Sequence, residues 1–265
     1  MALMLSAGEQ STYEEVAAIE TPCAENRHVP VPHSRLIDNT RSRLEQNGWE
    51  IVDEKYGLSN PRPDKVYKGA RPELRNNRGM NMWFQFEISR PEVKDWSFAP
   101  IIAGRNSHIQ DFSQHLLMGT NMFVCSNGQF SAEAQIRAKH TREGSSNADA
   151  RVTSIIEKIM SWAQHTKNAY DAYKELPFET SACITTMWGL YENHALDLGM
   201  LPIVKNEFVN PSHEEFEGQN LFSFANACTE AMKRSPSTIQ SKSLKLTDTL
   251  NKIAGIEAYA EYSEE

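Results

Sequence analysis

Residues 81–88 read Asn-Met-Trp-Phe-Gln-Phe-Glu-Ile, and this stretch decides the fold class of the 265-residue chain. Met82, Phe84, Phe86 and Ile88 alternate with the remaining side chains. A period of two is typical of a β-strand with one buried face. We therefore predict a strand here, with Phe84 and Phe86 turned into the core.

Further strand patterns lie on both sides of this stretch. These are residues 49–56, whose alternation fits an exposed strand imperfectly, and residues 98–103, 121–125 and 129–139. Pro100 lacks a backbone N–H, so the segment 98–103 is predicted to lie towards a sheet edge. Ser126-Asn127-Gly128 has the composition of a tight turn and should join the last two strands.

Helical patterns precede and follow the strands. Residues 11–15 contain two overlapping capping boxes, which predict a short helix. Ser34 is expected to cap a second helix that runs through Gln46 and stops at Asn47-Gly48, with Leu36, Ile37, Thr40 and Leu44 on its apolar face. After a break at Gly144–Asn147, helical spacing is seen at residues 152–176, 180–198, 220–232 and 241–254.

These elements predict an α+β protein, with an antiparallel or mixed sheet in the first half and a helical second half packed on it. We expect three regions along the chain. Residues 1–27 form an N-terminal extension with a short helix, residues 28–143 a helix plus β-sheet region, and residues 144–265 a helical region of the same globular unit.

Composition points to a soluble cytoplasmic protein. Its four cysteines form no Cys-x-x-Cys pair, which is typical of reduced thiols and argues against a zinc ribbon or a disulfide framework. The N-terminus lacks a basic and apolar leader pattern, and no window approaches 18 uninterrupted apolar residues. We therefore expect no membrane association.

The net charge of −8 is unevenly distributed. Arg62 to Lys158 holds 14 Lys/Arg against 10 Asp/Glu, a local +4, whereas the flanks together carry −12. A basic centre between acidic flanks fits an anionic ligand.

Nucleic-acid binding is the function that this basic centre predicts. Residues 58–78 should form a long surface loop, and Tyr67 and Trp83 are available for base stacking. The alternative is a solvated basic face. The candidate contacts are Lys65, Lys68, Arg71, Arg75, Arg78, Arg105, Arg137, Lys139 and Arg142, with His140 beside them.

Uncommon polar residues cluster between Gly104 and Arg142 and allow three interpretations. His108, Cys125 and His140 are metal-ligand types, with His115 or Asp111 as a fourth, but their spacing matches no recognised zinc arrangement, so we predict no metal and no cofactor. Cys125 could form a nucleophilic thiolate pair with His108 or His140, and Glu133 or Asp111 could orient the imidazole ring. No catalytic motif supports this interpretation. The third interpretation is structural: Asn106, Ser107, His108 and Asn127 satisfy one another and nearby backbone at a sheet end.

The ordered motifs Arg105-Asn106-Ser107-His108, Phe123-Val124-Cys125-Ser126-Asn127-Gly128 and Lys139-His140-Thr141 resemble the phage/plasmid-like protein family known as domain of unknown function 932. The resemblance extends over residues 28–255 and includes the segment Asn226–Glu230. It implies an accessory protein of phages, prophages or plasmids, and it implies no reaction.

The leading prediction is thus a non-catalytic accessory protein that contacts nucleic acid through its basic centre. The first alternative is a phage protein that inhibits a host defence or replication protein, for which the acidic flanks are suited. The second is a metal-dependent enzyme that uses the His/Cys motif. The sequence leaves the oligomeric state open.

Overall fold

The computed structural model describes residues 8–25, 28–60, 77–122, 128–139, 141–234 and 239–257. For residues 128–138 and 142–148 it describes the course of the backbone alone. The chain divides into two compact units. The first comprises residues 1–95, 99–118 and 135–159, and the second comprises residues 96–98, 119–134 and 160–265.

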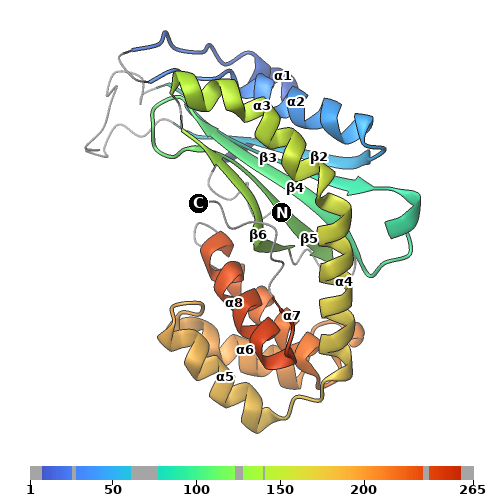
Figure 1. The fold of residues 1–265 in the computed structure, drawn as a ribbon. Helices are drawn as coiled ribbons and strands as arrows, with labels where there is room; N and C mark the ends of the chain where they lie inside the picture. The colour runs from blue at the N-terminus through green and yellow to red at the C-terminus, as the bar shows by residue number, and fades with distance from the viewer. Residues whose placement is uncertain are drawn as a thin grey trace. The chain divides into compact units, whose positions relative to one another are not determined.

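The described residues form one sheet in the order β1-β2-β3-β4-β5-β6 (Figure 1). β1 to β4 pair as antiparallel neighbours. The connections from β4 to β5 and from β5 to β6 are too short for a parallel crossover, which needs a dozen or more residues. The predicted α+β class with an antiparallel sheet in the first half and helices in the second is confirmed. The strands are β1 Glu9–Ser11, β2 Glu50–Leu58, β3 Asn81–Ser89, β4 Phe98–Ser107, β5 Gln114–Met122 and β6 Gly128–Ala138.

Strand β3 is buried on both faces. Phe84 and Phe86 are fully buried, as their alternation predicts. Trp83 and Gln85, on the other face, are also buried. The alternation therefore predicted the strand and one buried face correctly, but it did not predict that the opposite face is also buried.

Strand β4 lies between β3 and β5, so the predicted edge position of residues 98–103 is wrong. The reason is visible in the register. The ladder between β3 and β4 ends at Glu87 and Ile101, so Pro100 lies beyond the last paired residue and its missing N–H removes no bond to β3.

Gly104 permits the close packing of β3 and β4. It lies opposite Phe84, and a Cβ added to Gly104 would come within 2.2 Å of the Phe84 ring. Gly104→Ala is therefore expected to lower the free energy of unfolding by about 1 to 3 kcal/mol, because a fully buried ring must move. Chemical denaturation measures the change.

Gly189→Ala is the matched control for Gly104→Ala. A Cβ at Gly189, within a helix, meets no atom within 4 Å, and alanine there should stabilise the protein by about 0.5 to 1 kcal/mol. Equal effects of the two substitutions would contradict the packing described for Gly104.

Three helices belong to the first unit: α1 Tyr13–Ala17, α2 His33–Gln46 and α3 Arg142–Glu157. α1 begins with the predicted capping box, formed by Thr12 and Glu15. α2 begins after Pro32 without a side-chain cap, so Ser34 is not its cap. Its predicted apolar face is confirmed, since Leu36, Ile37, Thr40 and Leu44 are buried.

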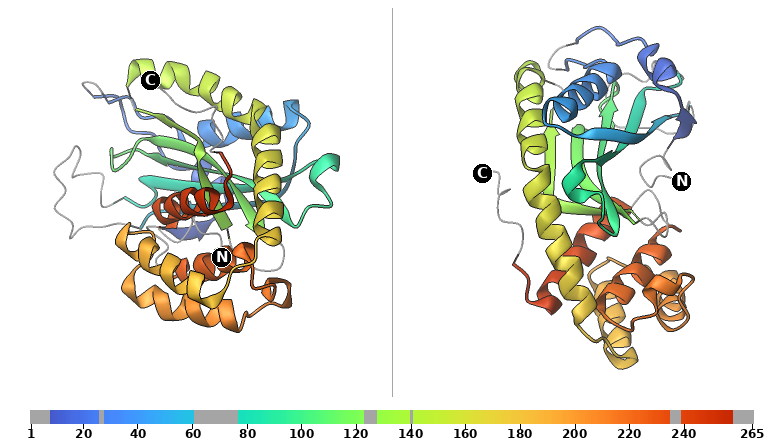
Figure 2. Two further views of the ribbon diagram at one scale, coloured as in Figure 1. Left: turned by 60° about the horizontal axis from the view of Figure 1, so that its bottom comes forward. Right: turned by 90° about the vertical axis from the view of Figure 1, so that its right-hand side faces the viewer.

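Helix α3 runs through Gly144–Asn147, where the sequence predicted a break. A glycine in a helix costs about 1 kcal/mol, which tertiary contacts readily offset. α3 lies beside α2 (Figure 2), and the Asp149 carboxylate accepts hydrogen bonds from Arg35 Nη2 at 2.9 Å and Asn39 Nδ2 at 3.0 Å. These contacts hold α3 in place.

Apart from strand residues within 96–98 and 119–134, the second unit is helical. Its centre is α7, whose Phe224 packs with Phe178 and Phe208 in an aromatic cluster. α4 ends before Leu176-Pro177 as predicted, whereas α6 was not predicted because nine residues carry too short a pattern. No helix in the described parts of the chain has the length and apolar character needed to span a membrane. The helices are α4 Ile159–Glu175, α5 Thr180–Glu192, α6 Leu201–Val209, α7 Leu221–Met232 and α8 Ile239–Ala254.

Candidate functional site

One end of the sheet collects the loops that carry the candidate residues. Because neighbouring strands are antiparallel, β2 ends, β3 begins, β4 ends, β5 begins and β6 ends on the same side. We call this side the loop end of the sheet. Its described residues are 59–60, 77–80, 105–113, 139, 141 and 142, and the ends of the strands that carry them lie at the upper left of the sheet in Figure 1.

Three predicted cationic residues at the loop end have described side chains. Lys139, directly after β6, is exposed. Arg78, shortly before β3, is also exposed, and its guanidinium lies 3.5 Å from Glu15 Oε1 and 3.9 Å from Glu9 Oε2. Exposed pairs of this length are weak, so Arg78 can exchange these partners for a phosphate.

Arg105 occupies a different environment. Its side chain is partly buried, and its guanidinium carbon lies 4.7 Å from the centre of the Phe112 ring. Trp83 is opposite Arg105 in the register, and its ring lies 5.7 Å from that of Phe112. Trp83 is buried and is not available for base stacking. That prediction is wrong because β3 is covered on both faces.

The other predicted cations cannot be placed individually. Arg137 and Arg142 lie at the end of β6 and the start of α3, and only their backbone is described. The segment 61–76 lies outside the described residues, but both of its ends are at the loop end. Ser59 N donates to Asn81 O at 2.9 Å and Gly79 N donates to Ser59 O at 2.8 Å. Lys65, Tyr67, Lys68, Arg71 and Arg75 belong to this segment.

Directly beneath the loop end lies a buried set of polar side chains, which we call the histidine cluster: His33, Asn106 and His108. The two imidazole rings stack with centres 3.8 Å apart and planes 3° from parallel. Asn106 Nδ2 donates to Val31 O at 2.8 Å and to His33 Nδ1 at 2.9 Å. The cluster thereby joins the start of α2 to the end of β4.

The hydrogen bonds fix both nitrogens of His33 and one nitrogen of His108. His33 Nδ1 accepts from Asn106, so Nε2 carries the proton and donates to Gly79 O at 2.8 Å. His108 Nε2 donates to Val31 O at 3.0 Å. Burial, against the opposing effect of the hydrogen bond to Val31 and with a smaller contribution from His28, lowers the pKa of His108 to about 4.

A second set of polar residues shapes the turn between β4 and β5. Ser107 Oγ accepts from the backbone N–H of Ile109 at 3.3 Å and from that of Asp111 at 3.1 Å. The Asp111 carboxylate accepts from Asn81 Nδ2 at 2.6 Å. The described motif residues thus bind backbone and neighbouring side chains, and they hold the loops that form the loop end.

The metal and nucleophile interpretations gain no support from the described residues, among which no three His, Cys, Asp or Glu side chains could hold a metal ion together. His108 is in the histidine cluster and His115 is buried. Cys125, Asn127 and His140 lie outside the described residues, and the side chain of Glu133 is not described. Asp111 is bonded to Asn81 as stated above.

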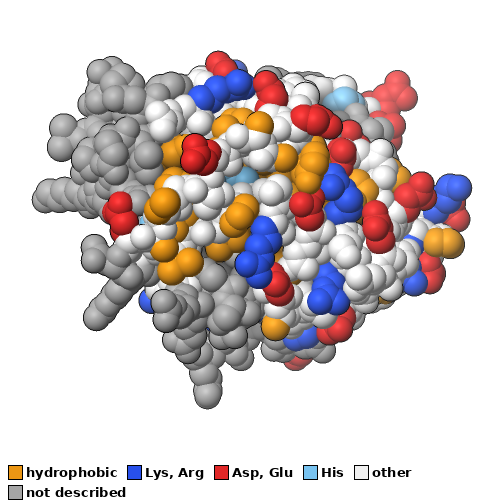
Figure 3. Space-filling view, turned by 90° about the horizontal axis from the view of Figure 1, so that it is seen from above, with side chains coloured by type: hydrophobic (Ala, Val, Ile, Leu, Met, Phe, Trp, Pro, Cys, Tyr) orange, Lys and Arg blue, Asp and Glu red, His pale blue; other side chains and the backbone are white. Residues whose placement is uncertain are grey.

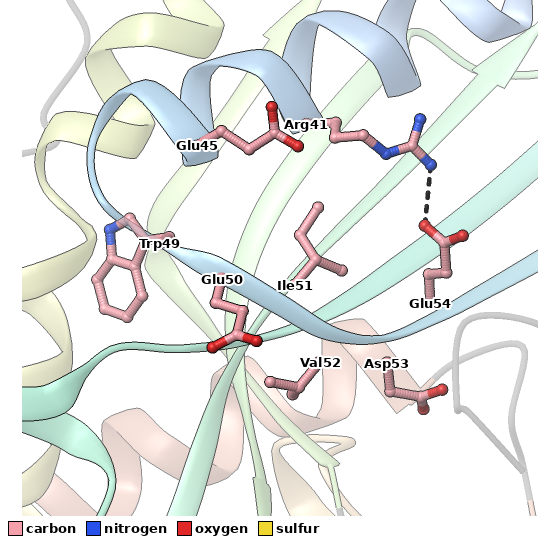
Figure 4. Close-up of a pocket in the computed structure, with 8 residues that line it drawn as sticks. All are labelled: Arg41, Glu45, Trp49, Glu50, Ile51, Val52, Asp53 and Glu54. Carbon is pink, nitrogen blue, oxygen red and sulfur yellow. Dashed lines mark hydrogen bonds and ion pairs between the residues drawn. The ribbon is translucent and has the colours of Figure 1, made fainter.

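A surface depression between α2 and β2 was not predicted (Figure 4). Its volume is about 600 Å³. The Arg41 guanidinium donates to Glu54 Oε2 and to Tyr56 Oη, each at 2.8 Å, so its charge is already neutralised. The four carboxylates of the lining would repel a phosphate. The lining residues are Arg41, Glu45, Trp49, Glu50, Ile51, Val52, Asp53 and Glu54.

The tyrosines beside this depression are held neutral. Burial, followed by the hydrogen bond to Glu54, raises the pKa of Tyr56 far above its ordinary value. The hydrogen bond to Asp38 raises the pKa of Tyr13. The imperfect alternation of residues 49–56 was the available sequence signal for this depression, because it left Glu50, Val52 and Glu54 without an assigned face.

No family model, no curated protein and no solved structure matches this chain. The resemblance to domain of unknown function 932 therefore stays a prediction that rests on the quoted motifs.

Proposed function

We propose that the protein is a non-catalytic accessory protein of a mobile genetic element that binds nucleic acid at the loop end of its sheet. One observation supports this most directly. Arg78, Arg105 and Lys139 are far apart in the sequence but lie at the same end of the antiparallel sheet, and the basic segment 61–76 connects Asn60 to Asn77 at that end.

The surroundings of the loop end support the same proposal. Ser59, Asn81 and the histidine cluster fix the bases of its loops through backbone hydrogen bonds, so cations on these loops start from a rigid scaffold. Elsewhere, charges of both signs are interspersed on the face shown in Figure 3. A phosphate backbone is recognised by convergent cations, and the loop end is where the topology brings them together.

Titration of labelled single- and double-stranded DNA and RNA with the protein tests the proposal. The titration is carried out at about 50 and about 200 mM salt, a range over which the release of counterions weakens phosphate binding measurably. We expect binding that weakens steeply as salt rises, because Lys and Arg displace condensed counterions. Simultaneous alanine substitution of five loop-end cations should weaken binding at least about tenfold. These are Lys65, Lys68, Arg71, Arg75 and Arg78.

The matched control removes the same amount of charge from the helical unit and should leave binding nearly unchanged. Absence of binding at the lower salt, or equal losses in the two variants, would contradict the proposal. The proposal would also be contradicted if the protein bound no nucleic acid but retained a protein partner from nuclease-treated host lysate. The control substitutions are alanine at Lys174, Lys205, Arg234, Lys245 and Lys252, all exposed.

A further inference from the structure

Helix α5 exposes an apolar face. Trp188 is 54% exposed and Ile184 is 49% exposed, and they lie four residues apart on the same side of the helix. Thr185 and Gly189 are also exposed. Residues 180–191 contain no Asp, Glu, Lys or Arg. An exposed helix face of this length is ordinarily charged, so this face has the character of a contact surface.

The opposite side of α5 already has its partners. Cys183, Met187 and Leu190 are buried, and α5 packs on α6 and α8. The exposed indole is also held in one orientation, because Trp188 Nε1 donates to Glu192 Oε1 at 3.0 Å and the ring lies 5.3 Å from that of Tyr191. A fixed aromatic side chain loses little entropy on binding and is typical of an interface anchor.

The charges around this face define its partner. Glu179 precedes α5 and Glu192 ends it, and both are exposed. The nearby cations are engaged elsewhere: Lys245 Nζ donates to Asn193 O at 2.8 Å, and Lys174 Nζ lies 4.9 Å from the centre of the Phe222 ring. The apolar stripe is therefore bounded by carboxylates at both ends.

We propose that the exposed face of α5 docks an amphipathic helix of another protein, one with an apolar stripe flanked by Lys or Arg. Leucine-type side chains spaced three and four residues apart would pack on Ile184 and Trp188, and the flanking cations would meet Glu179 and Glu192. A stable interface between folded proteins buries about 800 Å² on each partner. Two half-exposed side chains supply only part of that area, which fits a single helix.

A second copy of the chain is a poorer occupant. Antiparallel pairing of two α5 helices would bring Glu179 of one copy towards Glu192 of the other, and parallel pairing would bring like residues together. Either arrangement places carboxylate against carboxylate.

Two synthetic peptides test the proposal with the full-length protein. Both carry the same leucine stripe over four helical turns, one with lysine and the other with glutamate at its ends. We expect the lysine-flanked peptide to bind at least ten times more tightly, measured by anisotropy of a labelled peptide. Its binding should also shift the tryptophan emission to the blue, and Trp188→Phe should abolish that shift. Of the other four tryptophans, Trp96 is half-buried, whereas Trp49, Trp83 and Trp162 are buried.

Ile184→Ser and Trp188→Ser should each weaken binding at least tenfold with little change in melting temperature, because both side chains are exposed. Val52→Ser is the matched control, since Val52 is 50% exposed on β2 in the first unit. Binding that survives both α5 substitutions, equal affinity for the two peptides, or no binding of either would overturn the proposal. So would a dimer of the protein that Ile184→Ser dissociates.

Discussion

Replacement of Asn106 by alanine is expected to lower the free energy of unfolding by about 2 to 4 kcal/mol. The Asn106 amide is fully buried and donates to both Val31 O and His33 Nδ1. Alanine leaves His33 Nδ1 buried without its donor, at a cost of about 1 to 3 kcal/mol, and removes one of the two hydrogen bonds to Val31 O, which costs about 1 kcal/mol more. Urea denaturation followed by circular dichroism measures the loss.

Asn210→Ala is the matched control for Asn106→Ala. Asn210 is exposed at the end of α6, and its replacement should change stability by no more than about 0.5 kcal/mol. Equal stability of wild type and Asn106→Ala would show that the histidine cluster does not hold α2 to β4. An unchanged stability combined with lost nucleic-acid binding would make Asn106 a contact residue.

Stability is expected to fall by about 3 kcal/mol as the pH is lowered from about 6.5 to about 4. The pKa of His108 is lowered to about 4 in the folded protein, from an ordinary value near 6.5. Between these values the unfolded chain binds a proton that the folded protein does not. Stability is therefore complete above the unfolded pKa and is lost as the pH falls towards the folded pKa.

The geometry explains why the folded protein resists this proton. It would be added at Nδ1 of His108, which has no hydrogen-bond partner among the described residues, and the new charge would lie against the stacked ring of His33 and near His28. Burial without an acceptor disfavours the charged form.

Unfolding measured at several pH values checks this expectation. His108→Gln should flatten the pH dependence over this range, because glutamine does not titrate. His194→Asn, at an exposed position with φ of 62°, is the control and should keep the full slope, since asparagine tolerates this backbone conformation. A wild-type slope in His108→Gln would contradict the assignment.

Local patterns predicted the elements whose signals are local. The capping box of α1 and the apolar face of α2 each need only a dozen residues of sequence, and both are present. The sequence predicted a break at the start of α3 because Gly144 has poor helix propensity. The contacts of Asp149 in α3 with α2 offset that cost. α6 is too short for its periodicity to be distinguished from a loop.

For the candidate site, the sequence predicted which residue types take part but not how they are arranged in space. Basic residues could be counted along the chain, but which of the described ones lie at the same end of the sheet depends on the strand order. The histidine cluster joins His33 to Asn106 across 73 residues, and no local pattern indicates that contact. Trp83 was assigned to base stacking because alternation marks one face of a strand as exposed, and the structure covers both.

Photo-cross-linking tests the central claim, nucleic-acid binding at the loop end, most directly. A thiothymidine-substituted oligonucleotide is irradiated with the full-length protein, and the modified peptides are identified by mass spectrometry. We expect adducts in residues 59–80 and 137–142, which include or adjoin the described residues of the loop end, and their loss on competition with unlabelled oligonucleotide. Adducts confined to residues 160–257, or none under conditions in which the oligonucleotide is bound, would contradict the claim.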